Sequence, residues 1–396
     1  MYIAILGRQP ALGIAELERV FGGDKVTPLS NLAASVDTDK LDIQRLGGVL
    51  KTGLIITEIN SGDWFNASQK IVQHYLNDWS SYNGKITLGI SAYGFDAKPA
   101  EIQKTGIILK QKLKKINVSL RLIPNQDTTL STATSHHNKL GLADNKVELL
   151  VIKAKNERII IAESTGAQNI TAYTRRDQER PKRDAFVGML PPKLAQIMIN
   201  LACGQLEVLP TNHRLPPTIL DPFCGTGVIL QEAALQGYSV YGTDLSDKMV
   251  SYSRDNLKWL SDTHHVNFEL SLHEGDAMNT KWQQPIDAVV TEAYLGQPFS
   301  APPSPAKLDE VKRNCNHILT EFLKNLSSQT NSGTPVCIAV PAWRDKEGRF
   351  THLPLVGTIA QLGFKPHEFH NISQNDLLYY REDQIVAREL LVLSKI

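Results

Sequence analysis

The 396-residue sequence lacks several features that would assign it to a simple class of protein. It has only four cysteines, with no CxxC pair and no histidine at ligand spacing, so neither a disulfide framework nor a zinc site is indicated. No stretch reaches the roughly 18 consecutive apolar residues that a membrane helix needs, and no basic segment followed by a long apolar run opens the chain. We therefore expect a cytoplasmic protein without a membrane partner or a metal.

The sequence also has no marked excess of charge of either sign. A formal net charge of +1 does not by itself indicate a nucleic-acid-binding protein, so local clusters of basic residues have to carry that inference. The apolar fraction, 42%, is typical of globular proteins. A chain of this length exceeds one ordinary hydrophobic core, and we expect two or three domains.

Helix and strand signals alternate through the first 165 residues. A strand at 2–6, a helix after it and a helix-then-strand pair within 40–59 predict a small α/β unit that ends near residue 60. A second alternation, from a helix at 64–79 to paired strands within 146–165, predicts another α/β module. The polar, basic segment that follows has no periodicity and indicates a linker at 166–190.

The strands become strongly apolar from about residue 191 onward. Such runs, separated by helices, predict a parallel sheet that is buried on both faces, with antiparallel strands at one edge. The ligand of such an α/β sheet binds at the carboxyl ends of the strands. The apolar runs lie at 218–223, 238–244, 286–293, 335–342 and 387–394.

A glycine-rich turn follows the first of these strands, in TILDPFCGTG. Gly225 and Gly227 allow the backbone to approach a ligand closely, and Asp221 at the end of the strand can accept hydrogen bonds or pair with a cation. The phosphate-binding patterns GxGxxG and GxxxxGK[ST] are both absent. The turn is therefore expected to receive an uncharged or cationic group.

Two more acidic residues follow at the ends of successive strands. Asp244 ends the second strand, where a carboxylate typically holds the ribose hydroxyls of an adenosine cofactor, and Asp276 can reach an adenine amino group. Each acid alone is more often a helix cap or a turn residue, but three at successive strand ends form a specific pattern. The missing GxGxxG argues against the competing family of NAD-dependent dehydrogenases.

The motifs DPFCGTG, GTD and GDA resemble those of Rossmann-like S-adenosylmethionine methyltransferases. The resemblance implies S-adenosylmethionine as cofactor and places the first motif at its methionine and ribose portion, Asp244 at the ribose, and Asp276 with Ala277 at the adenine. The cofactor-binding residues that it implies are Asp221, Phe223, Gly225, Thr226, Gly227, Asp244, Leu245, Asp276 and Ala277.

Upstream segments narrow this resemblance. The stretches LGRQPALGIAELE, RLGGVLKTG, LSTATSHHNKL and residues 173–202 are together similar to the THUMP-containing tRNA guanine-10 N2-methyltransferase family of archaea and eukaryotes. The similarity implies a ferredoxin-like domain at 1–60, a THUMP domain at 61–165 that binds tRNA, the linker, and a Rossmann-like methyltransferase domain at 191–396. It also leaves open a small activating subunit, which some relatives use.

Clusters of basic residues fit a nucleic-acid partner without that resemblance. They lie in the helix around 101–116, in the segment after residue 130 and in the linker, and they can neutralise several phosphates. A solvated helix face is the competing explanation, and Asp177, Glu179 and Asp184 weaken the linker cluster in the same way. The candidate RNA-binding residues are Lys104, Lys112, Lys115, His137, Lys139, Arg175, Arg176, Arg180 and Arg183.

The segment after the fourth strand-end position departs from the family pattern. Amino-methyltransferases carry Asp or Asn, two prolines and an aromatic residue there, because the acid accepts the protons of the amine and the ring stacks on the base. This chain has Glu292-Ala293-Tyr294-Leu295-Gly296 instead.

Three interpretations of this segment are open. Glu292 replaces the acid with Leu295 at the place of the ring, or Tyr294 keeps its place with Thr291 in place of the acid, or a rearranged turn lets Glu292 and Tyr294 keep both functions. We favour the third interpretation, with Glu292 and Tyr294 as the catalytic pair. A degenerate protein that only binds tRNA, or an enzyme that methylates an amine of another RNA, DNA or protein, remains the alternative.

Overall fold

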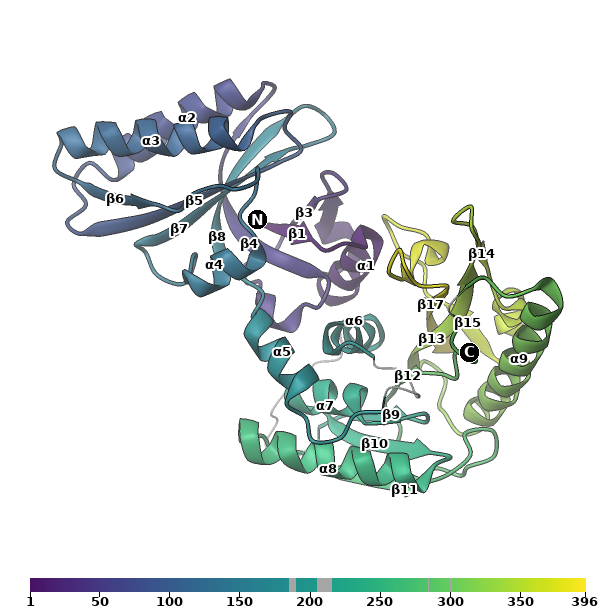
Figure 1. The fold of residues 1–396 in the computed structure, drawn as a ribbon. Helices are drawn as coiled ribbons and strands as arrows, with labels where there is room; N and C mark the ends of the chain where they lie inside the picture. The colour runs from purple at the N-terminus through teal and green to yellow at the C-terminus, as the bar shows by residue number, and fades with distance from the viewer. Residues whose placement is uncertain (185–189, 205–215, 284, 300) are drawn as a thin grey trace. The chain divides into compact units, whose positions relative to one another are not determined.

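The computed structural model describes residues 1–184, 190–204, 216–283, 285–299 and 301–396. It divides into two compact units (Figure 1). Unit 1 comprises residues 1–14 and 24–172, and unit 2 comprises residues 15–23 and 173–396. In the ranges that the structure describes, none of the helices is both long enough and apolar enough to cross a membrane.

Unit 1 is built on one eight-stranded sheet with the strand order β2-β3-β1-β4-β8-β7-β5-β6. Strand β5 runs parallel to β6 and β7, and the other neighbours are antiparallel. The strands are β1 (Tyr2–Leu6), β2 (Val26–Pro28), β3 (Ala33–Val36), β4 (Val49–Ile59), β5 (Lys85–Tyr93), β6 (Ser119–Leu122), β7 (Lys146–Lys153) and β8 (Ile159–Ala167).

The long strand β4 explains why this sheet crosses the boundary that the sequence places near residue 60. One edge of β4 pairs with β1 and the other with β8, so backbone hydrogen bonds join the two segments that were expected to be separate modules. The expected helix ahead of β4 is only a 3₁₀ turn, Ile43–Arg45, because Gly47 and Gly48 follow one residue later and disfavour its continuation.

Two long helices cover β5, β6 and β7 in unit 1, and they lie side by side (Figure 1). Helix α2 (Trp64–Asp78) begins at Asp63, whose carboxylate accepts the Asn66 N–H at 3.1 Å, as expected of an N-terminal cap. Helix α3 (Pro99–Lys115) buries Leu109 and Leu113 in a core shared with α2. Helix α4 (Thr132–His137) also belongs to unit 1, whereas α1 (Pro10–Phe21) and the 3₁₀ turn Gly23–Lys25 are divided between the two units.

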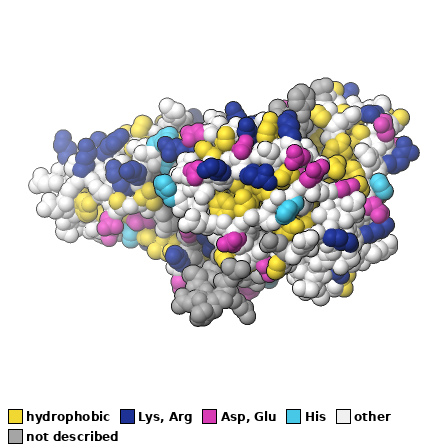
Figure 2. All heavy atoms as spheres, turned by 90° about the horizontal axis from the view of Figure 1, so that it is seen from below, with side chains coloured by type: hydrophobic (Ala, Val, Ile, Leu, Met, Phe, Trp, Pro, Cys, Tyr) yellow, Lys and Arg dark blue, Asp and Glu magenta, His cyan; other side chains and the backbone are white. Residues whose placement is uncertain are grey.

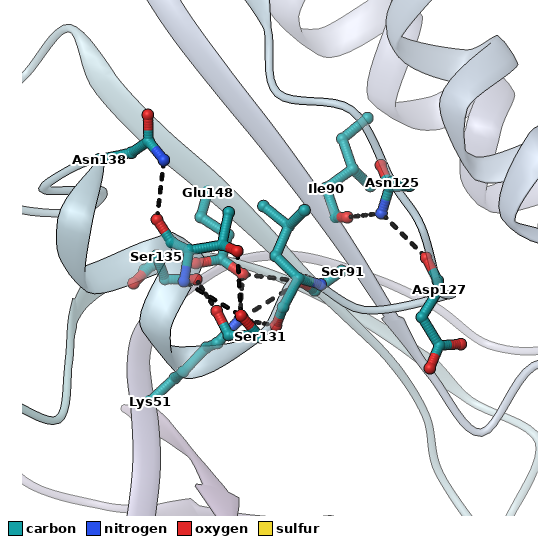
Figure 3. Close-up of polar contacts among 12 residues, drawn as sticks. Lys51, Ile90, Ser91, Asn125, Asp127, Ser131, Ser135, Asn138 and Glu148 are labelled. Atoms are coloured by element: carbon teal, nitrogen blue, oxygen red, sulfur yellow. Dashed lines mark hydrogen bonds and ion pairs between the residues drawn. The ribbon is translucent and has the colours of Figure 1, made fainter. Parts of the chain in front are cut away.

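A buried polar network ties the start of α4 to this sheet. Lys51 of β4, Ser91 of β5 and Glu148 of β7 point toward one another beneath the segment that leads into α4 (Figure 3). Lys51 pairs with Glu148 and donates to the Leu130 carbonyl at 2.7 Å, while the Leu130 N–H donates to Ser91 at 2.9 Å. Both backbone polar groups of Leu130 are therefore held just before the Ser131 cap of α4.

Unit 2 contains the predicted parallel sheet with an antiparallel edge. The order is β11-β10-β9-β12-β13-β17-β15, in which β9 to β13 are parallel and β17 is antiparallel to β13, so this part of the prediction is confirmed. The strands are β9 (Thr218–Asp221), β10 (Ser239–Asp244), β11 (Leu270–Glu274), β12 (Ala288–Glu292), β13 (Pro335–Arg344), β14 (Phe350–Thr351), β15 (Phe364–Pro366), β16 (Leu378–Tyr379) and β17 (Val386–Lys395).

Helices cover both faces of this sheet (Figure 1). On one face Leu220, Val289 and Ile338 share a core with α9 (Pro305–Ser327) and the 3₁₀ helix η3 (Pro354–Leu362). The other face carries α6 (Pro192–Cys203), α7 (Val228–Leu235) and α8 (Asp247–His264). Helix α5 (Ile170–Gln178) lies in the segment that was expected to be without regular structure, and a short 3₁₀ turn spans Gln374–Asp376.

Candidate active site

A cavity of about 770 Å³ opens at the carboxyl ends of β9, β10 and β12. This volume lies within the range of about 300–1,000 Å³ that small-molecule sites occupy. Residues that are far apart in the sequence meet here, because parallel strands bring their carboxyl ends to the same edge of the sheet. Predicted site residues that line the cavity are Asp221, Phe223, Gly225, Thr226, Asp244, Leu245, Asp276, Ala277, Glu292 and Tyr294.

The glycine turn after β9 has the backbone that the sequence predicts. Gly225 and Gly227 have φ values of +52° and +80°, a region that residues with a side chain rarely adopt. A Cβ atom on Gly227 would also lie 2.8 Å from the Ser253 hydroxyl oxygen. Gly227 is the cap of α7 and is not among the lining residues, so its part in the site is to shape the turn.

Asp244 at the end of β10 supports this turn with its carboxylate. One oxygen accepts the Gly225 N–H and the other accepts the Ser246 N–H, both at 2.9 Å. A carboxylate has about four acceptor positions, so each oxygen keeps one for a ligand hydroxyl. Asp276 lies similarly and accepts the Met278 N–H at 2.9 Å. Both acids fit the polar groups of an adenosine.

Asp221 is buried in the wall of the cavity, with an exposed fraction of 1%. Burial raises its pKa to about 7, and the carboxylates of Asp244 and Glu292 act in the same direction. Hydrogen bonds from the Thr291 hydroxyl at 2.7 Å and the Phe223 N–H at 3.2 Å act against this shift. Among the residues that the structure describes no cation pairs with Asp221, so a cationic ligand would stabilise its charged form.

The end of β12 presents both predicted catalytic side chains to the cavity. Glu292 and Tyr294 are lining residues, and Tyr294 is 42% exposed. Thr291 is fully buried and its hydroxyl is engaged with Asp221, which contradicts the interpretation that puts Thr291 in the role of the acid. Leu295 also lines the cavity, and Gly296 turns the chain with a φ of +80°.

The structure adds lining residues that the sequence did not single out. Asp184 and Lys248 form an ion pair of 3.0 Å at the cavity, although Asp184 had only been counted as a charge that weakens the basic linker. Asn314 and Ile318 of α9 also line it, one helical turn apart. Their i, i+4 spacing was visible in the sequence, but nothing there assigned that face of the helix to the cavity.

Most of the predicted RNA-binding residues are exposed. On the face that Figure 2 shows, Lys and Arg side chains gather at the left end of the view, where unit 1 lies in Figure 1. The exposed candidates in unit 1 belong to α3, to α4 and to the residues after α4, and two further candidates lie beyond α5 or on it. They are Lys104, Lys112, Lys115, His137, Lys139, Arg175 and Arg183.

The structure speaks against two of the RNA-binding candidates. The Arg176 guanidinium donates to both carboxylate oxygens of Glu232 on α7, at 2.6 and 3.1 Å. Arg180 is only 3% exposed, and Asp177 lies 3.6 Å from it. Arg176 on α5 is paired with Glu232, and Arg180, just beyond the end of α5, is buried, so the prediction of phosphate contacts for them is corrected.

Comparisons with known proteins find similarity to methyltransferase domains and to tRNA methyltransferases. Residues 219–317 match a family model described as a methyltransferase domain. A tRNA (guanine(10)-N2)-dimethyltransferase from Methanothermobacter thermautotrophicus is 33% identical over 173 residues, which are 43% of this chain. The match spans 45% of that relative, somewhat less than half of its length.

Two further similarities extend over more of the chain. A tRNA (guanine(10)-N2)-dimethyltransferase from Methanocaldococcus jannaschii is 23% identical over 275 residues, or 68% of this chain and 74% of that protein. The crystal structure of TrmN from Thermus thermophilus covers 100% of this chain and 99% of its own, with a TM-score of 0.54 and 15% identity, which indicates a shared fold. The sheet, the cavity and the matched segment together show that unit 2 carries a Rossmann-like, S-adenosylmethionine-dependent methyltransferase domain.

Proposed function

We propose that this protein transfers a methyl group from S-adenosylmethionine to the exocyclic N2 amine of a guanosine in tRNA, of the position 10 type. One observation carries the proposal: an acid and an aromatic side chain, Glu292 and Tyr294, share a cavity with the three strand-end aspartates. The names of the relatives from the two archaea point to the same nucleobase and the same atom. Enzymes of this chemistry need no metal and no covalent intermediate.

Each part of the cavity has a task in this proposal. Asp244 holds ribose hydroxyls, Asp276 and Ala277 hold the adenine, and ionised Asp221 faces the cationic portion of the cofactor. When bound, the cofactor supplies an electrophilic methyl group on a sulfonium sulfur. As the C–S bond breaks and an N–C bond forms, the amine loses one proton, and S-adenosylhomocysteine leaves.

The end of β12 prepares the amine for this transfer. The lone pair of an aromatic amine is delocalised into the ring, so the nitrogen is a weak nucleophile. Glu292 accepts a hydrogen bond from the amine and draws its proton away, while Tyr294 stacks on the base once it has left the helix stack. A side chain that is 42% exposed beside the cavity can meet a base that arrives from solvent.

The N-terminal part of the chain would deliver the tRNA. We propose that the ferredoxin-like segment at 1–60 and the THUMP segment at 61–165 share the single sheet of unit 1, followed by the linker at 166–190 and the catalytic domain at 191–396. The exposed lysines of α3 and the residues around α4 would contact phosphates. A small activating subunit stays an open part of this proposal.

Transfer of a labelled methyl group tests the proposal. The purified protein is incubated with tRNA transcripts and S-adenosylmethionine carrying a radiolabelled methyl, and the modified nucleoside is identified after digestion. We expect label on guanine N2, and no label on a transcript in which G10 is replaced by A. Glu292→Gln should lower the rate about 100-fold, since misplacing or removing one positioning group costs on that order.

Absence of label with every tRNA tested would favour the degenerate tRNA-binding protein instead. In that case Asp244→Ala, which removes the ribose contact, should leave any RNA-dependent phenotype intact. Label on another nucleotide of tRNA would support methyl transfer to tRNA but show that the modified position is not G10.

A further inference from the structure

The catalytic strand end of β12 has a partner two strands away. Arg388 on β17 donates from its Nε atom to the carboxylate of Glu292, and the exposed fractions of the two side chains are only 10% and 15%. No sequence motif pointed to Arg388, which lies in the run of apolar residues that forms β17. Glu292 lines the cavity and Arg388 does not, so the pair links the cavity wall to a residue behind it, which only the folded sheet brings close.

The register of the sheet places both side chains on the same face. Glu292 stands opposite Ala339 of β13, Ala339 stands opposite Leu390 of β17, and Arg388 is two residues from Leu390. Side chains two residues apart on a strand point to the same face. The contact therefore bridges over β13, where the small side chain of Ala339 leaves room for it.

The span of this bridge explains why a glutamate stands at position 292. Neighbouring strands are about 4.8 Å apart, so β12 and β17 are separated by roughly 10 Å. A long arginine reaching over β13 meets a glutamate halfway, whereas an aspartate would fall short by one bond of about 1.5 Å. The contact with Arg388 thus requires the extra methylene that Glu292 has over an aspartate.

The arrangement leaves one carboxylate oxygen for chemistry. Arg388 contacts Oε1, and for the residues that the structure describes no hydrogen bond to Glu292 Oε2 is present. A free glutamate side chain rotates about one more bond than an aspartate, which spreads its carboxylate over several positions. A planar guanidinium donates in a fixed direction and removes that freedom.

We infer that Arg388 is a positioning residue, which fixes Glu292 so that its free oxygen faces the amine to be methylated. This inference rests on the proposed function. Arg388 replaces the rigidity that a pair of prolines after the acid supplies in the usual motif of amino-methyltransferases. It acts through Glu292 and does not itself contact cofactor or base.

A double-mutant cycle tests this inference. Arg388→Gln and Glu292→Asp each break the contact, and each should lower kcat roughly 10- to 100-fold, with the affinity for S-adenosylhomocysteine unchanged within about twofold. If both act through the same contact, Arg388→Gln should add less than about threefold in the Glu292→Asp background. Arg388→Lys, which keeps the charge, should recover part of the rate. Arg349→Gln removes the same charge from an exposed side chain of unit 2 and should leave kcat unchanged.

Additive losses in the double variant, or loss of cofactor affinity with Arg388→Gln, would overturn the inference. A second measurement does not depend on methyl transfer. Crystal structures of the wild type and of Arg388→Gln should show Glu292 ordered in the first and spread over several rotamers in the second. An unchanged Glu292 in the variant also overturns the inference, whereas a wild type that labels no tRNA refutes the proposed function alone.

Discussion

Asp221 combines burial with a place in the wall of the cavity, and its pKa of about 7 makes the site sensitive to pH. A cationic cofactor binds better to the ionised carboxylate than to the neutral acid. Affinity for S-adenosylmethionine should therefore rise about tenfold between pH 6 and pH 8, as the ionised fraction grows from about one tenth to about nine tenths. Isothermal titration calorimetry measures it. A profile of the same steepness in Asp221→Asn would assign the dependence to another group.

The same residue should stabilise the fold only when it is protonated. Its folded-state pKa lies above its unfolded value of 3.8, so its contribution is fully present below about pH 4 and is lost as the pH rises through 7. Asp221→Asn mimics the protonated acid. We expect it to raise the midpoint of thermal unfolding of unit 2 at pH 8 and to leave it nearly unchanged at pH 4. An equal shift at both values would rule out ionisation as the cause.

At the scale of elements, the ion pair between β4 and β7 holds unit 1 together from inside. Lys51 and Glu148 are both buried, so removal of Lys51 alone leaves an unpaired carboxylate that costs about 3–5 kcal/mol. Lys51→Met should therefore lower the unfolding free energy far more than the double variant Lys51→Met/Glu148→Leu. Hydrogen exchange of peptides from β5 and β7, with increasing urea, measures this difference for unit 1.

A matched control lies on the same strand as Glu148. Lys153, which is partly exposed, pairs with the exposed Glu157, and Lys153→Met should change the unfolding free energy much less than Lys51→Met. If the double variant proved as unstable as Lys51→Met, the loss would come from the untied Leu130 backbone, and α4 would then exchange faster than β5 and β7.

Elements with a strong periodic signal were predictable from the sequence, and the others were not. Helices α2 and α3 and the parallel strands β9, β10, β12 and β13 appear where the sequence predicts them, because apolar spacing indicates directly which face is buried. Strand β11 is largely polar and was not predicted. Strands β2 and β3 have only three and four residues, which is too short for an alternating pattern of apolar and polar residues to predict them. Helix α5 is mostly polar, so it has too few apolar residues to show a helical spacing in the sequence.

The candidate site divides in the same way. The aspartates at the strand ends are recognisable in the sequence, because a glycine-rich turn follows the first of them and the second ends an expected strand. Two contacts depend on the order and register of the strands, which a local sequence pattern does not indicate. They are those of Arg388 with Glu292 and of Thr291 with Asp221. Arg176 and Arg180 illustrate the reverse, since a run of arginines resembles an exposed cluster although the fold pairs the first with a carboxylate and buries the second.

At the scale of the whole molecule, the proposed tRNA surface of unit 1 and the cofactor cavity of unit 2 should respond separately to mutation. Lys104→Gln/Lys115→Gln removes two exposed charges of α3, so tRNA affinity should fall. In a plot of the logarithm of the binding constant against the logarithm of the salt concentration, the slope should become less steep by about two. Filter binding over a series of salt concentrations measures the slope. Affinity for S-adenosylmethionine should not change, and an unaltered slope would place the phosphates elsewhere.

The acidic lining of the cavity also bears on molecules that resemble the cofactor. Adenine nucleotides share its base and sugar, yet they carry phosphates, and the cavity wall holds Asp221, Asp244 and Asp276, whereas its Glu292 and Lys248 are paired with Arg388 and Asp184. Like charges repel strongly where the surroundings are poor in water. We therefore expect ATP to bind more weakly than S-adenosylmethionine. We also expect an extruded neutral base, rather than the sugar-phosphate backbone, to be the part of a nucleic acid that enters the cavity.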